Sequence, residues 1–130
     1  MTQTQAIAAV IEKSGRFLLA RRSPTKRTAA GYWCPITGRI EPGETEEQAV
    51  VREVFEEVGL HVTATRKIGE MDTRDKHARM HWWQTQITGG EAFIKCDENT
   101  ELTWVTVEEM KLLHPIFEED VAVFEKLAKK

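Results

Sequence analysis

The amino-acid sequence predicts a mixed α/β fold, and three observations support this expectation. Short apolar runs bounded by turn residues indicate strands, a capped amphipathic segment indicates a helix, and a further helical stretch follows the last predicted strand. The chain shows neither an internal repeat nor a low-complexity segment. We therefore expect a single domain over residues 1–130, long enough to enclose a hydrophobic core.

Five apolar runs are predicted to form strands. The first two, Ala6 to Ile11 and Phe17 to Ala20, are joined by a turn-like connection that ends at Gly15. The stretches 21–32 and 33–44 contain three of the four prolines, so we expect both to be irregular. The remaining strands are expected at residues 62–68, 80–87 and 102–107.

A helix is predicted to begin near Thr45. The Thr45 hydroxyl can accept a hydrogen bond from a free amide of the first turn, and Gln48 completes a capping-box pattern. Gly59 suits the left-handed position that follows a helix end. Two further helices are expected at residues 108–113 and 116–127.

The composition limits the classes of partner. Charged residues make up 30% of the chain, but the formal net charge is only −3 and the two signs are interspersed. A broad nucleic-acid-binding surface needs a cationic excess, so nucleic acid is not an expected partner, whereas a small phosphorylated substrate needs only a few local cations. No apolar stretch approaches the roughly 20 residues that span a membrane, and the cysteines lack metal-site spacing. We expect a cytoplasmic protein without a membrane partner.

Three glutamates gather on one side of the predicted helix. At about 100° per residue, Glu53, Glu56 and Glu57 fall within one sector, while apolar residues occupy another. A solvated acidic face is the ordinary interpretation of such a pattern. Like charges at these spacings repel one another, however, and Arg52 is the only basic residue in the helix. Clustered carboxylates without cationic partners suit magnesium, which takes oxygen ligands, so the pattern favours a metal site.

A glycine-containing loop precedes this helix. Gly38 and Gly43 permit backbone conformations that other residues avoid, so main-chain groups can approach a cation or a phosphate closely. A loop folded back onto a carboxylate-bearing helix would form a compact cation site.

The segment from residue 38 to residue 60 matches a known family pattern. That pattern is Gly, five residues, Glu, seven residues, Arg-Glu, an aliphatic residue, any residue, Glu-Glu, any residue, Gly and an aliphatic residue. The chain fills every defined position, with Gly38, Glu44, Arg52, Glu53, Val54, Glu56, Glu57, Gly59 and Leu60. The sequence thus resembles the Nudix hydrolase family, more loosely along its whole length. The resemblance implies a Nudix-type α/β/α sandwich with a mixed β-sheet, in which this box forms a loop–helix–loop.

The same resemblance implies a metal-dependent reaction. Glu53, Glu56 and Glu57, helped by the carbonyl of Gly38, would hold Mg²⁺, for which Mn²⁺ is expected to substitute. The ion would neutralise phosphate charge and acidify a water that attacks phosphorus. The implied function is a Mg²⁺-dependent pyrophosphohydrolase that cleaves a diphosphate linkage in a nucleoside triphosphate or a nucleotide-like substrate.

Further catalytic roles follow from the resemblance. Arg52 would orient a neighbouring carboxylate through a charge-assisted hydrogen bond. Glu44 would brace the loop or act at the substrate site through water. Glu53 is the first candidate for the general base, and Glu98, six residues before Trp104, is the second.

Substrate contacts are expected outside the box as well. Arg21 resembles a basic residue that many members place near the substrate phosphates. Trp82 and Trp83 are consecutive in a predicted strand, so they point to opposite faces. One is expected to pack in the core, and Trp83 is the candidate for substrate contact.

The box says little about which substrate is cleaved. The segment Trp33 to Gly38 resembles a stretch of dihydroneopterin triphosphate pyrophosphohydrolases, whereas members acting on oxidised dGTP often carry Pro-Gly-Gly where this chain has Ile36-Thr37-Gly38. Hydrolysis of ADP-ribose or a dinucleotide stays an alternative. The acidic balance disfavours an RNA 5′-end pyrophosphohydrolase, and the complete box disfavours a non-catalytic nucleotide sensor. Dimers are common in the family, so a homodimer stays open.

Overall fold

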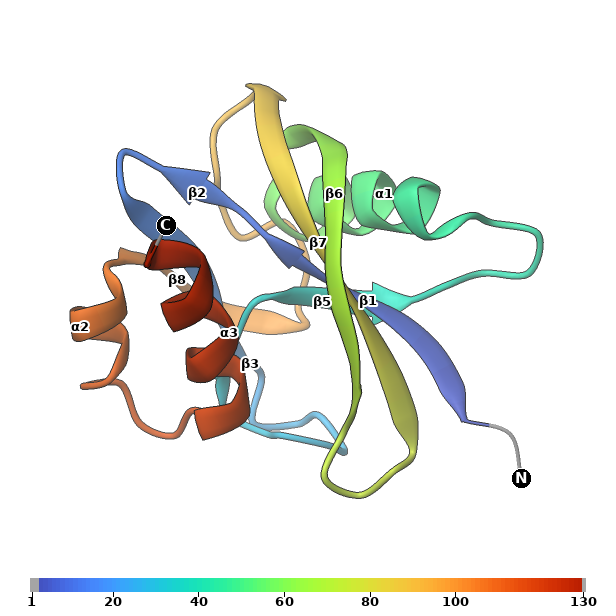
Figure 1. The fold of residues 1–130 in the computed structure, drawn as a ribbon. Helices are drawn as coiled ribbons and strands as arrows, with labels where there is room; N and C mark the ends of the chain where they lie inside the picture. The colour runs from blue at the N-terminus through green and yellow to red at the C-terminus, as the bar shows by residue number, and fades with distance from the viewer. Residues whose placement is uncertain (1–2, 130) are drawn as a thin grey trace.

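The structure, a computed structural model, describes residues 3–129 (Figure 1). The strands are β1 (Thr4–Val10), β2 (Glu12–Lys13), β3 (Arg16–Arg22), β4 (Trp33–Cys34), β5 (Ile36–Arg39), β6 (His61–Asp72), β7 (Ala78–Gly89) and β8 (Asn99–Val105). The helices are α1 (Glu46–Val58), α2 (Val107–Met110) and α3 (Glu118–Ala128).

Two four-stranded sheets form the centre of the molecule. The first has the order β5-β1-β7-β6 and is mixed, because β1 runs parallel to β7 while the other two pairings are antiparallel. In the second sheet β3 pairs antiparallel with β2, β4 and β8. The mixed sheet expected from the sequence is therefore accompanied by a second, antiparallel sheet.

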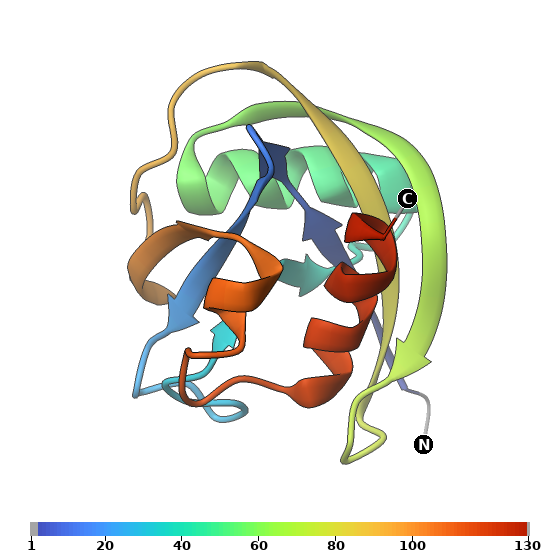
Figure 2. The same ribbon diagram turned by 60° about the vertical axis from the view of Figure 1, so that its left-hand side comes forward.

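Alternating side chains of the central strands feed two hydrophobic cores. Along β1, Ile7 and Ala9 pack in a core with α1, whereas Ala8 and Val10 pack in a core with α2 and α3. Such alternation follows from the two-residue period of a strand. Figures 1 and 2 show α1 on one side of the first sheet, with α2 and α3 on the other. The layers thus form the α/β/α sandwich expected from the sequence.

Helix α1 has the predicted termini. Thr45 accepts from the Gln48 amide, and the Gln48 side chain accepts from the Thr45 amide, so the capping box is complete. Gly59 ends the helix in the left-handed conformation, with φ of 74°. A good N-cap contributes about 1 kcal/mol. The carboxylate-bearing helix therefore has a fixed start and a fixed end.

Several element boundaries differ from the expectations. Part of the stretch 33–44, expected to be irregular, forms β4 and β5 on either side of Pro35, because β5 finds its hydrogen-bonding partner in the distant strand β1. Strands β6 and β7 extend beyond the predicted ranges because they pair with each other as far as Asp72 and Arg79. Helices α2 and α3 are shorter than predicted. Within residues 3–129, no helix is long and apolar enough to cross a membrane.

Candidate active site

The site begins where strand β5 meets helix α1. Gly38 pairs with Ile7 of β1, which brings the β5 backbone against the Glu53 side chain. A Cβ atom added at Gly38 would lie 2.0 Å from the Glu53 carboxyl carbon, a separation that real Cβ atoms do not adopt. A larger residue at position 38 would therefore displace the Glu53 carboxyl group from its place beside β5.

Arg52 donates hydrogen bonds to three carboxylates and to the main chain before the helix. Its Nε and Nη2 donate to the two oxygens of Glu44 at 2.7 and 2.9 Å, and Nη1 donates to Glu53 and to Glu56, both at 3.0 Å. Nη2 also donates to the Arg39 carbonyl at 2.9 Å. Hydrogen bonding to Arg52 lowers the pKa of Glu44. The guanidinium thus fixes the loop that carries Glu44 onto helix α1.

Glu57 lies deeper than the other box glutamates and is only 5% exposed. Its Oε1 accepts from the Asn99 amide at 2.9 Å, while Oε2 has no hydrogen-bonding partner within residues 3–129. Burial, together with the adjacent Glu53 carboxyl, raises the pKa of Glu57 to about 9. Burial also raises the pKa of Glu53. The carboxyl groups of Glu53 and Glu57 are thus neighbours, are largely shielded from water, and lack enough nearby positive charge to balance two negative charges.

The donor set fits a divalent cation. Orphaned buried oxygens are rare in native proteins, and a carboxylate oxygen such as Glu57 Oε2 is the ligand type that Mg²⁺ prefers. Glu53 supplies a second carboxylate beside the β5 backbone. Within residues 3–129, no three acidic, histidine or cysteine side chains already converge on one point, since Glu56 is 56% exposed and turned to Arg52. The Glu53 and Glu57 pair is therefore the centre of the candidate site.

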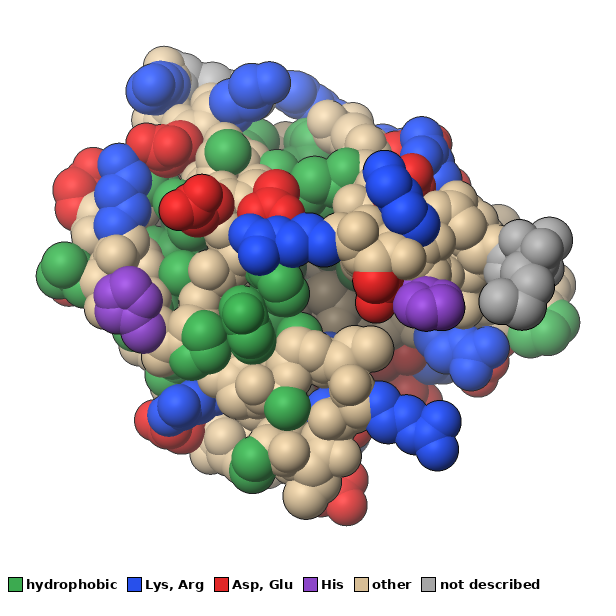
Figure 3. Space-filling view, turned by 90° about the horizontal axis from the view of Figure 1, so that it is seen from below, with side chains coloured by type: hydrophobic (Ala, Val, Ile, Leu, Met, Phe, Trp, Pro, Cys, Tyr) green, Lys and Arg blue, Asp and Glu red, His purple; other side chains and the backbone are tan. Residues whose placement is uncertain are grey.

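A cavity of about 660 Å³ lies beside Glu53, whereas Glu57 is not among the residues that line it. Gly38, Glu53 and Glu98 line it on the glutamate side. The rest of the wall comes from β1, β7, the loop after β3, the β6–β7 hairpin and the start of α3. Figure 3 looks onto this face, where a hollow lies among acidic and basic side chains. Helix α1 and the other walls therefore enclose one continuous space.

Aromatic and apolar side chains line part of the cavity, with one carboxylate among them. Met80 and Trp82 from β7 and Phe117 from the start of α3 contribute to this part. Asp120 on α3 also lines it, and burial, with the charge of Glu119, raises the pKa of Asp120 to about 7. Burial, with the charge of Asp120, raises the pKa of the Cys34 thiol to about 12. These residues form a largely apolar compartment that contains the Asp120 carboxyl group.

Only some of the residues expected near the substrate line the cavity. Glu98 lines the cavity and forms an ion pair with Lys26 at 2.8 Å. Arg21 instead donates to the Gly31 carbonyl and to Glu101, both at 3.1 Å. Trp83 packs on the α1 side and donates to Glu46 at 2.9 Å. Neither of these last two residues lines the cavity.

Their immediate neighbours do line it. Arg22, which follows Arg21, contributes to the cavity wall, and so does Trp82, which precedes Trp83. The two-residue period of a strand shows that such neighbours face opposite ways, but it does not show which face borders the cavity. Sequence reasoning also missed Asn99 and Asp120, which belong to no local pattern and reach the site only through the tertiary fold.

Comparisons with known proteins agree with the fold. The chain is 31% identical over 127 residues to the CTP pyrophosphohydrolase of Escherichia coli (strain K12), covering 96% of this chain and 91% of that protein. It is 33% identical over 101 residues to a putative 8-oxo-dGTP diphosphatase of Bacillus subtilis (strain 168), covering 78% of this chain and 64% of that protein. The crystal structure of the MutT protein from Methanosarcina mazei Go1 superposes with a TM-score of 0.84 at 25% identity, covering 98% and 96% of the two chains.

The family match and the nearly full-length relative define the chain as a hydrolase of phosphorus-containing acid anhydrides. Residues 1–127 match the NUDIX domain, and the chain belongs to that family. It is thus a Nudix pyrophosphohydrolase with the predicted Nudix fold. The family generally uses a divalent metal ion and implies a nucleotide-like small-molecule substrate.

Proposed function

We propose that this enzyme is a Mg²⁺-dependent pyrophosphatase of nucleoside triphosphates, with CTP or a related cytidine nucleotide as the preferred substrate. The observation that carries the proposal is the continuous cavity that extends from Glu53 to the compartment around Asp120. Its volume of about 660 Å³ falls in the range of small-molecule sites. The match over nearly the whole length of a CTP pyrophosphohydrolase supports the choice of nucleotide.

The two parts of the cavity suit the two halves of a nucleotide. The base would lie in the apolar compartment, where Asp120 can hydrogen-bond its polar edge and Phe117 and Trp82 supply apolar contact. The triphosphate would extend towards Glu53, past Lys26 and Arg39, which also line the cavity. A few local cations of this kind are sufficient to attract phosphate on a chain of net charge −3.

The metal would be Mg²⁺, with Mn²⁺ as a substitute. Glu53, Glu56 and Glu57 and the Gly38 carbonyl would hold it, and Arg52 keeps the first two of these glutamates in place. When bound, the ion supplies positive charge to the phosphates and makes a nearby water more acidic.

Proton transfer falls to a glutamate of this chain. Glu53 is the first candidate to take the proton from the attacking water and Glu98 the second, because both line the cavity. The new bond forms between the water oxygen and phosphorus, and the bond between that phosphorus and the bridging oxygen breaks. Two phosphorylated products leave, a nucleoside monophosphate and pyrophosphate when the triphosphate is cut next to the α-phosphate.

A substrate panel tests this proposal. CTP, dCTP, UTP, ATP, GTP, 8-oxo-dGTP, dihydroneopterin triphosphate and ADP-ribose are each incubated with the protein and Mg²⁺, and released pyrophosphate or nucleotide is quantified, with EDTA as the control. We expect kcat/KM to be highest for the cytidine nucleotides and EDTA to abolish it. Cleavage that persists in EDTA would overturn the metal-dependent mechanism, and a clear preference for ADP-ribose would overturn the triphosphate assignment.

An oxidised purine triphosphate is the second candidate substrate. The relative from Bacillus subtilis named as a putative 8-oxo-dGTP diphosphatase supports it, although the chain covers only 64% of that protein. A carboxyl group whose pKa lies near 7, as at Asp120, can donate or accept a hydrogen bond and so suits either type of base. The same panel separates the two candidates through the ratio of kcat/KM for 8-oxo-dGTP to that for CTP.

A further inference from the structure

The partner of Glu57 comes from a distant part of the chain. Asn99 opens strand β8, is 7% exposed, and donates from Nδ2 to Glu57 Oε1 at 2.9 Å. Its backbone lies opposite Arg22, where the pairing of β3 and β8 shifts register between Arg21 and Arg22. Irregularities of this kind change the direction of a side chain relative to a regular ladder. The Asn99 amide is thus placed against helix α1 by the sheet pairing.

The segment before Asn99 holds the backbone of α1 as well. The Phe93 amide donates to the Val58 carbonyl at 3.0 Å, and the Lys95 amide donates to the Glu57 carbonyl at 3.1 Å. Residues 93–99 therefore contact both the main chain and the side chain of Glu57. Glu98, which lines the cavity, lies in the same segment. The positions of Glu57 and Glu98 are consequently coupled.

The chemical type of the partner determines what it can do. A lysine or arginine would both orient and neutralise a carboxylate, as Arg52 does for Glu44. The Asn99 amide donates one hydrogen bond and carries no charge. It therefore fixes the direction of the Glu57 carboxyl group without adding a positive charge beside it, and Oε2 has no hydrogen-bonding partner among residues 3–129.

We infer that Asn99 is a positioning residue for the metal site, which directs Glu57 Oε2 towards the divalent ion. This inference rests on the proposed function, because it takes Glu57 as a ligand of the ion. Residues that hydrogen-bond to a metal ligand typically change metal affinity by about 10–100-fold when they are replaced. Asn99 is expected to act in this range.

Binding of Mn²⁺, followed by electron paramagnetic resonance of the free ion, tests the inference without measuring turnover. We compare the wild type with Asn99→Leu, which has similar size and no donor, and with Asn99→Ser, whose short side chain ends before Glu57. Thr100→Val is the matched control, because Thr100 is the next residue of β8 and is exposed. Both Asn99 variants are expected to bind Mn²⁺ about 10–100-fold more weakly, whereas Thr100→Val retains wild-type affinity.

Thermal unfolding and Glu57→Gln separate the possible results. If a folded Asn99 variant loses thermal stability in EDTA but binds Mn²⁺ within twofold of the wild type, Asn99 is only structural and the inference is overturned. If Glu57→Gln itself keeps wild-type Mn²⁺ affinity and activity, the metal role of Glu57 in the proposed function fails. Weak Mn²⁺ binding in Glu57→Gln and in both Asn99 variants supports the two statements together.

Discussion

The first and last turns of helix α1 both carry glutamates, but the two ends provide them with different partners. At the first turn, Glu46 lies 3.0 Å from the Lys67 ammonium and accepts from the Trp83 indole at 2.9 Å. At the last turn, Glu57 has the neutral Asn99 amide on one oxygen and nothing within residues 3–129 on the other.

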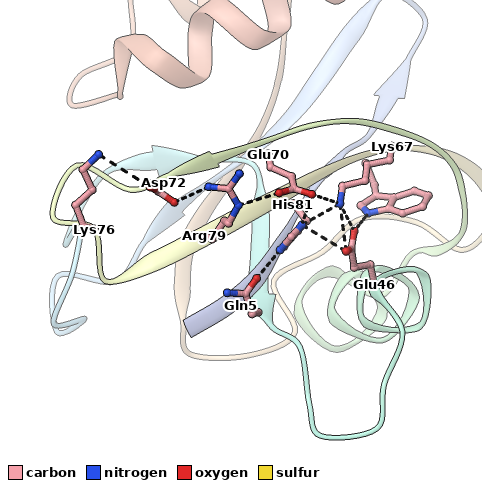
Figure 4. Close-up of polar contacts among 9 residues, drawn as sticks. Gln5, Glu46, Lys67, Glu70, Asp72, Lys76, Arg79 and His81 are labelled. Atoms are coloured by element: carbon pink, nitrogen blue, oxygen red, sulfur yellow. Dashed lines mark hydrogen bonds and ion pairs between the residues drawn. The ribbon is translucent and has the colours of Figure 1, made fainter. Parts of the chain in front are cut away.

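The partners of Glu46 belong to a longer chain of ion pairs, drawn in Figure 4. Lys67 also contacts Glu70 at 2.7 Å, Glu70 contacts Arg79 at 2.8 Å, and Arg79 contacts Asp72 at 2.9 Å. The buried His81 lies among them, with 3.0 Å between its Nδ1 and the Lys67 Nζ atom.

The two ends of α1 therefore differ in how far their glutamates are neutralised by cations of the chain. Against the effect of burial, hydrogen bonds from Lys67 and Trp83 lower the pKa of Glu46, whereas burial raises the pKa of Glu57 to about 9. At the first end the protein supplies its own cations, and the helix is fixed to the sheet. At the other end, residues 3–129 supply no cation to Glu57, so either a proton or a bound cation neutralises its carboxylate.

The largest expected effect comes from neutralising a glutamate in the last turn of α1. We expect Glu57→Gln, and separately Glu56→Gln, to lower kcat by roughly 10²–10³-fold, because several kcal/mol of metal-derived charge stabilisation is lost. The unfolding temperature in EDTA should be unchanged or higher, since glutamine can still accept from Asn99. Steady-state kinetics and circular dichroism measure the two quantities. Glu47→Gln, on the exposed side of the first turn, is the control, and equal rates for it and Glu57→Gln would contradict the metal role.

Magnesium should stabilise the enzyme through the same end of the helix. A ligand present at 100 times its dissociation constant raises the free energy of unfolding by about 2.7 kcal/mol. We expect Mg²⁺ to raise the unfolding temperature of the wild type, EDTA to reverse the rise, and Glu57→Gln to show little of it. An identical rise in wild type and variant would place the ion elsewhere. Differential scanning fluorimetry over a Mg²⁺ titration provides the measurement.

The compensated end should respond in stability instead. Lys67→Met removes the cation shared by Glu46 and Glu70, and we expect it to lower the free energy of unfolding by about 0.5–1 kcal/mol, because the partly buried Glu46 carboxylate loses its charged partner. Lys76→Met is the matched control, since Lys76 lies at the exposed end of the same network, 4.0 Å from Asp72. Urea denaturation compares the two. If both variants unfold alike, the network does not stabilise the start of α1.

Asp120 offers a third environment, because it forms no ion pair within residues 3–129, and its effect should depend on pH. Its pKa of about 7 in the folded state exceeds the value of about 4 for an unfolded aspartate. The folded protein therefore holds a proton that the unfolded chain releases, and this contribution to stability declines between pH 4 and 7 and is constant above. Asp120→Asn lacks the decline. Relative to the wild type, its free energy of unfolding, measured by urea denaturation, should rise between pH 4 and 7. A difference between the two proteins that does not change with pH would contradict the raised pKa of Asp120.

Local sequence patterns predicted the frame of the site. The Thr45 and Gln48 capping box and the terminal Gly59 are contacts between near neighbours in sequence, and the structure contains them as expected. Likewise, of two consecutive tryptophans, one was expected in the core, and Trp82 is 3% exposed. Such features depend on spacing alone, and spacing is visible in the sequence.

Features that depend on pairing between distant strands were not predictable in this way. The β5 strand exists because residues 36–39 pair with β1, and the shift at Arg21 and Arg22 depends on β8. That shift decides which arginine borders the cavity and where Asn99 lies. Asp120 approaches the cavity only because α3 packs behind the sheet. No local pattern records these long-range arrangements.

The walls of the cavity and the chemistry of α1 come from separate stretches of the chain. Among the described residues that line the cavity, α1 contributes Glu53, while loops, strand ends and the start of α3 contribute most of the remainder. In evolutionary terms, substitutions in those walls can change which phosphorylated molecule is bound while the sequence of the helix stays the same. Gene duplicates would then differ in substrate specificity before they differ in the reaction that they catalyse.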